Sequence, residues 1–342
     1  MKIAIHQRKG SFSDRWIPYC KKNNIPYKIV NCYDSEIIAK LADCDGLMWH
    51  WSHADYRAQL FARQLIFSLE KKGIKVFPDF NTCWHFDDKV GQKYLLESIK
   101  APLVPTHVFY NKQDAFQWIK KTTFPKVFKL RGGAGSQNVK LVKSKRTALR
   151  LVRKAFGNGL PLVDKTSGIK QRFWVLRRDK NFSAFIYLVK GFVRFIYPKE
   201  GLSLLPRQKG YVYFQDFISQ NEFDDRVIVI GNKAIAIRRY NRKGDFRASG
   251  SGLIKHNPDL FSKEIIEIAF EVAELIKSQS IAFDFVYDIK GKPLIIEISY
   301  AYAQGWAYDN CPGYWDKNLK WHNDKVDPQR YMLEDFVKTI HG

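Results

Sequence analysis

The sequence predicts an α/β protein of more than one domain, with a parallel α/β unit at its start and antiparallel hairpins toward its end. The chain has 342 residues, which is more than a single hydrophobic core usually holds. Its first 80 residues alternate between short apolar runs and amphipathic stretches, as parallel α/β units do. Residues 226–240 and 281–299 instead have the pattern of paired strands joined by short turns that contain glycine.

The charge of the chain is strongly basic, with 57 Lys and Arg against 34 Asp and Glu and a net charge of +23. Such a chain can bind nucleic acid, an anionic membrane or small anionic ligands. The basic residues are spread along the chain, so we expect small anions and no nucleic acid. No apolar run is long enough to span a membrane. Five scattered cysteines without a CxxC pair suit a reducing, cytoplasmic setting.

The first unit should be a parallel sheet with helices between its strands. The expected strands are Lys2–His6, Tyr27–Val30, Gly46–Trp51 and Ile74–Pro78. The clearest helix is Tyr56–Lys72, which Gly73 should end. Ligands of open α/β sheets gather at the carboxyl ends of strands. Two such ends, residues 6–9 and 49–53, carry polar and aromatic side chains. His50 and His53 have a spacing that metal ligands use, but a substrate or structural role is favoured.

The middle of the chain should form a second group of strands and helices. The expected strands are Thr106–Tyr110, Lys126–Leu130, Asn138–Lys143 and Tyr211–Ile218. The expected helices are Asp88–Ile99, Gln113–Lys121 and one that Ser144 caps and that runs to Phe156. Residues 157–170 read as a loop. The apolar residues after it favour strands, with Lys190-Gly191 as a hairpin turn.

Two hairpins and a helix should complete the fold. The expected segments are Arg226–Ile230 paired with Ala234–Tyr240 around Gly231-Asn232, the helix Ser262–Lys277, and Ile281–Asp288 paired with Pro293–Ser299. A two-residue turn at Lys290-Gly291 would place Asp284 directly opposite Glu297. Alternation then puts Ser299 on the same face. The side chains on the opposite, core face would be Phe283, Phe285, Ile296 and Ile298.

Two carboxylates facing each other need a compensating cation, because like charges opposite each other destabilise a sheet. Mg²⁺ suits this position, since it takes oxygen ligands and links carboxylates to phosphates. A longer turn, or one carboxylate simply exposed to water, remains the alternative.

A glycine-rich loop is the second candidate element. Arg131–Ser136 contains three glycines within five residues, so its backbone N–H groups can approach phosphate oxygens. Lys129 lies just before it in an apolar strand, where a lysine is either an edge residue or a phosphate ligand. The loop matches neither a Walker nor a Rossmann pattern. A surface hairpin is the alternative interpretation.

The order of these motifs resembles that of an ATP-grasp domain. Lys129, the glycine loop, Phe214–Ile218, Asp225-Arg226, Arg239, Gly244–Arg247 and the Asp284–Ser299 hairpin follow one another in the order found in the ribosomal-protein glutamate ligase and glutathione synthetase branch. The resemblance covers roughly residues 86–300. It implies an α/β ATP-grasp fold with α+β subdomains behind a parallel α/β domain. The implied divisions are 1–85, 86–218 with the lysine strand and glycine loop, and 219–342 with the hairpin and an aromatic tail.

The same resemblance implies ATP and Mg²⁺ as cofactors and assigns roles to residues. The residues expected at the nucleotide are Lys89, Lys129, Gly132, Gly133, Ala134, Gly135, Ser136, Gln215, Asp216, Phe217, Ile218 and Asp225. Arg247, with Arg239, is expected to steady the transferred phosphate. Asp284, Glu297 and Ser299 are the expected metal ligands. Two departures stand out, because the family usually has Asn at the Ser299 position and Glu at the Asp216 position.

The implied reaction is ADP-forming ligation of a small carboxylate to an amine through an acyl phosphate. The aromatic residues after Ser299 suit stacking on a sugar, and a sugar acid joined to an amine is one candidate reaction. A lid packed on the core explains the aromatic residues equally well. A small-molecule phosphotransferase and a non-catalytic binder of anionic polymers stay open, as does a homo-oligomer.

Overall fold

The computed structural model describes residues 1–133, 138–162, 165–196, 206–248 and 250–341. The chain divides into two units, of which unit 1 combines Met1–Val104 with Ile218–Gly342 and unit 2 is Pro105–Phe217. Residues 86–104, expected with the small lobe, belong to unit 1, because helix α5 (Lys89–Ser98) packs against strand β13 (Pro293–Ser299). The finer division into three lobes stays a prediction.

Unit 1 begins with a parallel sheet of order β2-β1-β3-β4. Its strands are β1 (Ile3–His6), β2 (Tyr27–Val30), β3 (Gly46–Met48) and β4 (Lys75–Phe77). Its helices are α1 (Ser13–Lys22), α2 (Ile37–Lys40), α3 (Tyr56–Lys71) and α4 (Phe80–Cys83). The chain turns to one side after β1 and to the other after β3, so the carboxyl ends of these two strands are neighbours. Arg8 Nη2 donates to the His50 carbonyl there, at 3.3 Å. The two expected strand ends therefore meet.

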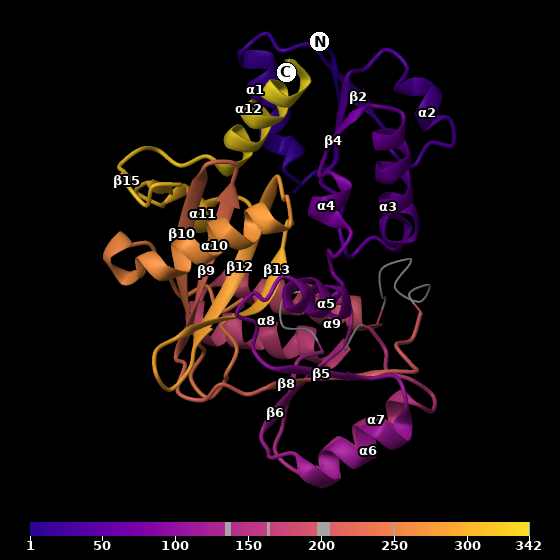
Figure 1. Ribbon diagram of the computed structural model, residues 1–342, viewed down its shortest axis with the longest axis vertical. Coiled ribbons are helices and arrows are strands. Elements are labelled where there is room, and N and C mark those ends of the chain that lie inside the picture. The colour runs from indigo at the N-terminus through magenta and orange to yellow at the C-terminus, as the bar shows by residue number, and fades with distance from the viewer. Residues whose placement is uncertain (134–137, 163–164, 197–205, 249, 342) are drawn as a thin grey trace. The chain divides into compact units, whose positions relative to one another are not determined.

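The C-terminal helix α12 (Pro328–His341) returns to this first sheet and packs beside α1 (Figure 1). The Trp16 indole donates to the Gln329 carbonyl at 3.1 Å. Ile5 of β1, Ile228 of the second sheet and Phe336 of α12 share one buried core, so the first and last segments of the chain fold together.

The second sheet of unit 1 is mainly antiparallel, in the order β13-β12-β9-β10-β14-β15, with β11 also paired to β10. Its further strands are β9 (Phe223–Ile230), β10 (Lys233–Tyr240), β11 (Ile254–Lys255), β12 (Ser280–Tyr287), β14 (Tyr314–Asp316) and β15 (Trp321–His322). Helix α10 (Lys263–Leu275) covers one face, where Val227 and Phe283 are buried. A short 3-10 helix, Pro258–Leu260, precedes it, and α11 (Trp306–Asp309) follows β13. The predicted turn at Gly231-Asn232 is confirmed, since Ile230 pairs with Lys233.

Unit 2 holds a four-stranded antiparallel sheet of order β5-β8-β6-β7. Its strands are β5 (Thr106–Phe109), β6 (Lys126–Lys129), β7 (Lys140–Val142) and β8 (Val212–Asp216). Helices α6 (Lys112–Lys121) and α7 (Lys145–Ala155) pack on one face, over Phe128 and Phe214. The predicted cap is confirmed, because the Ser144 side chain accepts from the Thr147 amide.

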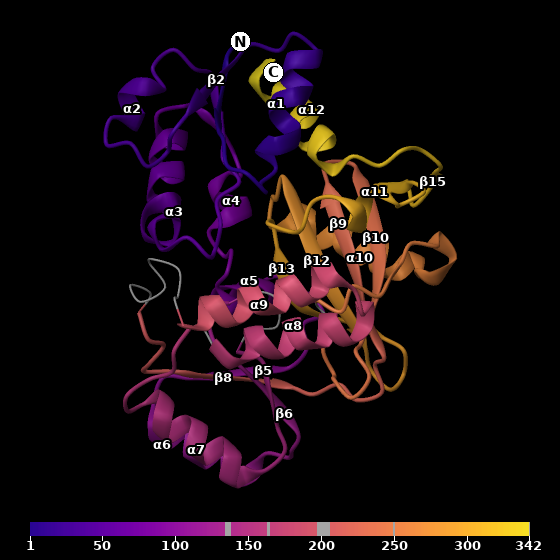
Figure 2. The ribbon, with the colours of Figure 1, turned by 180° about the vertical axis from the view of Figure 1, so that it is seen from behind.

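The predicted hairpin at Lys190-Gly191 is wrong, and so is the end of the predicted loop before it. Residues 165–196 form two helices, α8 (Lys165–Asp179) and α9 (Phe182–Ile196), which lie side by side (Figure 2). The aromatic and β-branched residues of this segment favour strands when they are counted by type alone. Their spacing is helical instead, with Ala184, Leu188 and Gly191 on one buried side of α9.

The aromatic residues that follow β13 belong to the core. Tyr300, Tyr302 and Tyr308 are each at most 5% exposed, and Trp315 is 7% exposed. The sequence left two interpretations of this tail open, sugar stacking and a lid packed on the core. The burial of these four residues agrees with the packed lid. Apolar burial therefore accounts for an aromatic pattern that also suits sugar stacking.

Two buried histidines should make the stability of unit 1 sensitive to acid. Nδ1 of His6 accepts from the Cys32 amide at 3.0 Å, and Nδ1 of His50 accepts from the Phe12 amide at 3.1 Å. Burial, with Arg8 nearby, lowers the pKa of His6 from 6.5 to about 4 and that of His50 to about 3. The unfolded chain therefore binds more protons below about pH 6.5. We expect the melting temperature to fall as pH decreases from 6.5 toward 4.

The matched variant is His6→Asn with His50→Asn, which keeps an acceptor at each position and removes the titrating ring. We expect it to flatten the decrease in melting temperature across that range. An equally steep decrease in the double variant would show that other groups cause it.

Candidate functional site

The hairpin of β12 and β13 places Asp284 directly opposite Glu297, as expected. The turn itself differs from the expected one. Gly291 N–H donates to the Asp288 carbonyl, and Asp288 pairs with Lys292 around a three-residue loop in which Gly291 has φ +78°. A β-bulge at Ile296 then restores the expected register. Asp284 pairs with Glu297, but the next residue, Phe285, pairs with Ile295, so Ile296 has no partner position on β12. The longer turn and the bulge offset each other.

The bulge also changes which residue enters the core. Ile295 is fully buried, whereas Ile296, the residue expected there, is only half-buried. The other expected core residues of the hairpin, Phe283, Phe285 and Ile298, are buried beside α10. Alternation then directs Asp284 to the face opposite α10.

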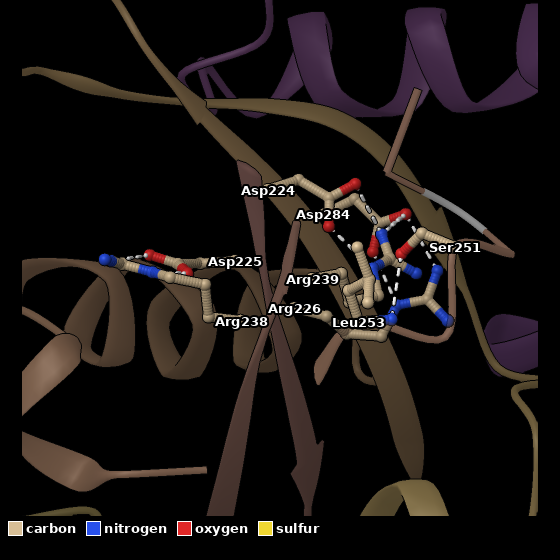
Figure 3. Close-up of polar contacts among 8 residues, drawn as sticks. All are labelled: Asp224, Asp225, Arg226, Arg238, Arg239, Ser251, Leu253 and Asp284. Carbon is tan, nitrogen blue, oxygen red and sulfur yellow. Dashed lines mark hydrogen bonds and ion pairs between the residues drawn. The ribbon is translucent and has the colours of Figure 1, made fainter. Parts of the chain in front are cut away.

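Four charged side chains form a neutral cluster on that face, which we call the carboxylate–arginine cluster: Asp224, Arg226, Arg239 and Asp284 (Figure 3). Arg226 holds Asp284 through two bonds of 2.6 and 2.8 Å. Arg239 holds Asp224 through bonds of 2.6 and 2.7 Å and also approaches Asp284 at 2.9 Å. The sheet register explains these contacts, because Asp284 pairs with Arg226 across strands and Arg239 with Asp224.

The cluster supplies Asp284 with positive partners. Without a metal, two facing carboxylates alone are expected to raise the pKa of one of them or to make one turn away. Burial alone would raise the pKa of Asp284, but Arg226 and Arg239 lower it well below its usual range. Sequence analysis missed this because Asp224 and Arg226 were not assigned to the site. Their position across the sheet from Asp284 and Arg239 is the signal that identifies them.

Glu297 has a cation of its own. Lys89 begins helix α5, is 4% exposed, and lies 3.2 Å from Glu297 Oε1, whose side chain is 31% exposed. Burial lowers the pKa of Lys89, but Glu297 and Asp87 raise it by more, so the ammonium group stays charged. The structure therefore joins an expected phosphate ligand and an expected metal ligand in one ion pair.

His53, at the carboxyl edge of the first sheet, interacts electrostatically with Lys89 and Glu297. Burial lowers the pKa of His53. Asp87 and Glu297 raise that pKa, while Lys89 and Arg8 lower it, and the net shift is downward. His53 is therefore neutral near pH 7. Arg8, His53 and Asp87 were not among the expected site residues, although two of the three lie in the strand ends singled out for their polar residues.

Two carboxylates with free coordination would suit Mg²⁺, which often takes one or two protein carboxylates together with phosphate oxygens. Glu297 is partly exposed and fits this role. Asp284 has both oxygens engaged by arginines, and the Ser299 hydroxyl donates to the Ala301 carbonyl at 2.9 Å. Within the described part of the chain, no group of three or more His, Cys, Asp or Glu side chains is placed to hold a metal. Of the two carboxylates, Glu297 is the one that is partly exposed, so a metal here would take most of its oxygen ligands from a bound ligand.

Two further expected residues lie away from this cluster. Asp225 is fully buried on the α10 face, held by Arg238 through two bonds of 2.8 Å and by the Tyr287 hydroxyl. Figure 3 shows this pair apart from the four-residue cluster. Arg247 forms an ion pair of 2.7 Å with Asp245, two residues earlier in the loop after β10. The sheet thus separates Asp225 from Asp284, and the expected role of Asp225 at the nucleotide stays a prediction.

In unit 2, the expected nucleotide residues divide between the two faces of the sheet. Lys129 is 6% exposed and pairs across strands with Tyr213, on the face opposite α6 and α7. Asp216 lies on the helix-covered side, where Lys126 Nζ donates to it at 2.6 Å. Gln215 donates to the Thr106 hydroxyl at 3.1 Å. Asp216 therefore has a lysine partner of its own and does not lie beside Lys129.

The remaining expected residues follow strands of the same sheet. Phe217 and Ile218 are half-buried directly after β8. Gly132 and Gly133 follow β6, and Gly133 has φ +110°, a conformation that glycine adopts easily. Ala134, Gly135 and Ser136 lie outside the described residues.

Comparison with known proteins gives one family match and several similar structures. The family described as RimK-like ATP-grasp domain matches residues 199–304. D-alanine–D-alanine ligase from Bacillus anthracis, solved with ATP, is 13% identical with a TM-score of 0.59, covering 100% of this chain and 98% of that one. A RimK domain ATP-grasp protein from Sphaerobacter thermophilus is 14% identical with a TM-score of 0.51, covering 87% and 90%.

A third structure extends the range of similar enzymes. The biotin carboxylase domain of 2-oxoglutarate carboxylase from Hydrogenobacter thermophilus, solved with MgADP and bicarbonate, is 15% identical with a TM-score of 0.57. It covers 98% of this chain and 69% of that one. No curated protein matches the sequence.

The placement of Asp225 gives a testable result. Asp225→Ala should lower the free energy of unfolding by about 3–5 kcal/mol, because it leaves the Arg238 charge buried without its carboxylate. Affinity for nucleotide, measured by calorimetry at a temperature where the variant is folded, should not change. Asp259→Ala, at an exposed aspartate, is the control and should be near neutral in both measurements. A stable Asp225→Ala protein with weakened nucleotide binding would restore the role expected from the sequence.

Proposed function

We propose that this chain, which has the ATP-grasp fold, is an ATP-dependent ligase that joins a small carboxylate to an amine. The observation that carries the proposal is the placement of Asp284 opposite Glu297, with Lys89 and two arginines bound to them. These residues combine oxygen ligands with fixed positive charge, which phosphoryl transfer needs. The family match over residues 199–304 supports the same assignment.

The reaction proceeds in two balanced steps. A carboxylate oxygen of the substrate attacks the γ-phosphorus of ATP; an O–P bond forms, the bond to the bridging β–γ oxygen breaks, and ADP leaves. The amine nitrogen then attacks the carbonyl carbon of the acyl phosphate; a C–N bond forms, the C–O bond to phosphate breaks, and phosphate leaves while the nitrogen loses a proton. Positioning and charge neutralisation supply most of the rate in such steps.

Each charged residue takes a separate part in this proposal. Mg²⁺, held by Glu297 and Asp284, would neutralise the β- and γ-phosphates. Lys89 would bind a phosphate oxygen from its buried position, and the phosphate-binding role expected of Lys129 is kept as part of the proposal. Incoming phosphate would also attract Arg226 and Arg239, which would free Asp284 from its two guanidinium partners. Arg239, with Arg247, would then steady the charge that develops on the transferred group.

The substrates are proposed only as classes. The buried state of Tyr300, Tyr302 and Tyr308 removes part of the argument for a sugar, since these rings pack in the core. The argument for a carboxylate and an amine rests on the fold and on the charge of the site. A sugar acid remains one candidate among carboxylates.

Product analysis tests the reaction type directly. The protein is incubated with ATP, Mg²⁺ and pooled sugar acids, amino acids and amines, and products are identified by mass spectrometry. We expect ADP, phosphate and a condensed product whose mass equals carboxylate plus amine minus water, with ADP release that requires both substrates. A stable phosphorylated product would instead identify a phosphotransferase, and absence of ADP under every condition would contradict both.

Glu297→Gln tests the site within that assay. It should abolish Mg²⁺-dependent ATP turnover, because the side chain loses the charge that holds the metal. It should also lower the apo free energy of unfolding by about 1–3 kcal/mol, because buried Lys89 loses its counter-charge; exposure of Glu297 keeps the loss below that of a fully buried pair.

The sequence alone predicts the opposite stability effect, namely unchanged or higher apo stability through relief of repulsion between carboxylates. Glu274→Gln, at an exposed position on α10, is the control and should keep both turnover and stability. Full turnover in Glu297→Gln would remove the proposed metal role.

A further inference from the structure

Helices α8 and α9 form a helical hairpin whose main contacts are internal. Ala184, Leu188 and Gly191 line the buried side of α9. A Cβ added to Gly191 would lie 2.4 Å from Arg172 Cδ of α8, and Arg172 Nη1 donates to the Tyr187 carbonyl at 2.7 Å. Among the described elements, the two helices make their principal contacts with each other. Within the described part of the chain, the outer side of α9 is exposed.

The outer side of α9 is a continuous exposed apolar stripe. Its members, at helical spacing, are Phe182 at 76% exposure, Phe185 at 49%, Val189 at 41%, Phe192 at 50% and Val193 at 52%. Phe173 of α8 adds a ring that is 50% exposed. Seven of the 17 exposed large apolar residues among the described part of the chain belong to this one hairpin. Such a concentration marks an interaction surface.

The hairpin is also strongly basic. Residues 165–196 contain eight Lys and Arg and a single acidic residue, Asp179. Arg177, Arg178, Lys180 and Lys190 are exposed. Arg177 lies over the Phe173 ring at 5.3 Å, so positive charge borders the apolar surface. A helix with exposed Phe and Val on one side and Lys and Arg at its edges has the composition of helices that lie in a membrane interface.

We propose that the α8–α9 hairpin attaches the protein peripherally to an anionic lipid surface. The apolar stripe of α9 would enter the boundary between headgroups and acyl chains, and the basic residues would meet lipid phosphates. No helix within the described residues is long and apolar enough to cross a bilayer.

The charge and the apolar stripe of the hairpin disfavour two other binding partners, a second copy of the chain and nucleic acid. Two copies of the hairpin would each bring an excess of seven positive charges to a shared interface, which like-charge repulsion opposes. Nucleic acid would meet the basic residues through its phosphates but would leave the Phe and Val stripe in water. An anionic bilayer satisfies both the apolar stripe and the positive charge.

Vesicle co-sedimentation with the full chain tests this proposal. The probes are vesicles of phosphatidylcholine alone and vesicles that also contain phosphatidylglycerol. We expect binding to the anionic vesicles at least tenfold tighter than to the neutral ones, with a decrease as salt is added. Equal binding to both compositions would overturn the electrostatic part, and no binding to either would overturn the proposal.

Three sets of variants separate the contributions. Phe182→Ser with Phe185→Ser and Phe192→Ser should reduce anionic-vesicle binding at least tenfold, because it removes the apolar stripe without touching the buried side of α9. The matched control places serine at three exposed apolar positions elsewhere, Leu60, Leu275 and Ile289, and should bind as the unchanged protein does. Arg177→Glu with Lys180→Glu and Lys190→Glu should also lose anionic-vesicle binding.

A folding failure is distinguished by circular dichroism and ATP binding, which all the variants should keep. The charge variants leave every apolar contact of the hairpin in place, so they test the proposal even where the serine variants do not fold. Unchanged vesicle binding in both hairpin sets would contradict the assignment of this surface. Conversion of a solution dimer to a monomer by the serine variants, without vesicle binding in the unchanged protein, would replace the lipid surface with a second copy.

Discussion

The buried ion pairs of the second sheet determine the register of β9, β10 and β12. Asp224, Arg226 and Asp284 find their partners on one face, and Asp225 finds Arg238 on the other. A one-residue slip of β9 would exchange its two faces and leave charged groups on both without a partner. Removing one member of a buried pair costs far more than the pair contributes, so alternative registers are disfavoured. The position of the candidate metal carboxylate depends on this constraint.

The same arrangement gives the candidate site its electrostatic character. Each carboxylate that the site offers is matched by a buried or half-buried cation, so the positive groups are already in place when a polyanion arrives. Phosphates would therefore meet positive groups that are already in place, and the rearrangement left is the release of Asp284 by its two guanidinium partners. In the apo protein, the same cations offset the cost of two neighbouring carboxylates, which the sequence alone assigns to a metal.

Local sequence signals predicted most of the elements, and long-range pairing explains most of what they missed. Turn glycines and helix caps identified the Gly231-Asn232 hairpin and the helix after Ser144, because both signals act within a few residues. The helices α8 and α9 were missed because their residue types favour strands while their spacing favours helices. Arg226 and Asp224 were missed because only the alignment of three strands brings them to Asp284. Asp225 lies on the other face of the sheet because successive residues of a strand alternate between its two faces.

Because of the bulge at Ile296, the pairing of Asp284 with Glu297 does not depend on the number of residues in the turn between β12 and β13. A two-residue turn without a bulge and the observed three-residue loop with the bulge use the same stretch of chain, and both place Asp284 opposite Glu297. The hairpin can therefore exchange turn length against the bulge while Asp284 stays opposite Glu297. The two arrangements contain the same residues in the same order, so a sequence alignment does not distinguish them. Structural superposition is the safer guide to equivalent residues here.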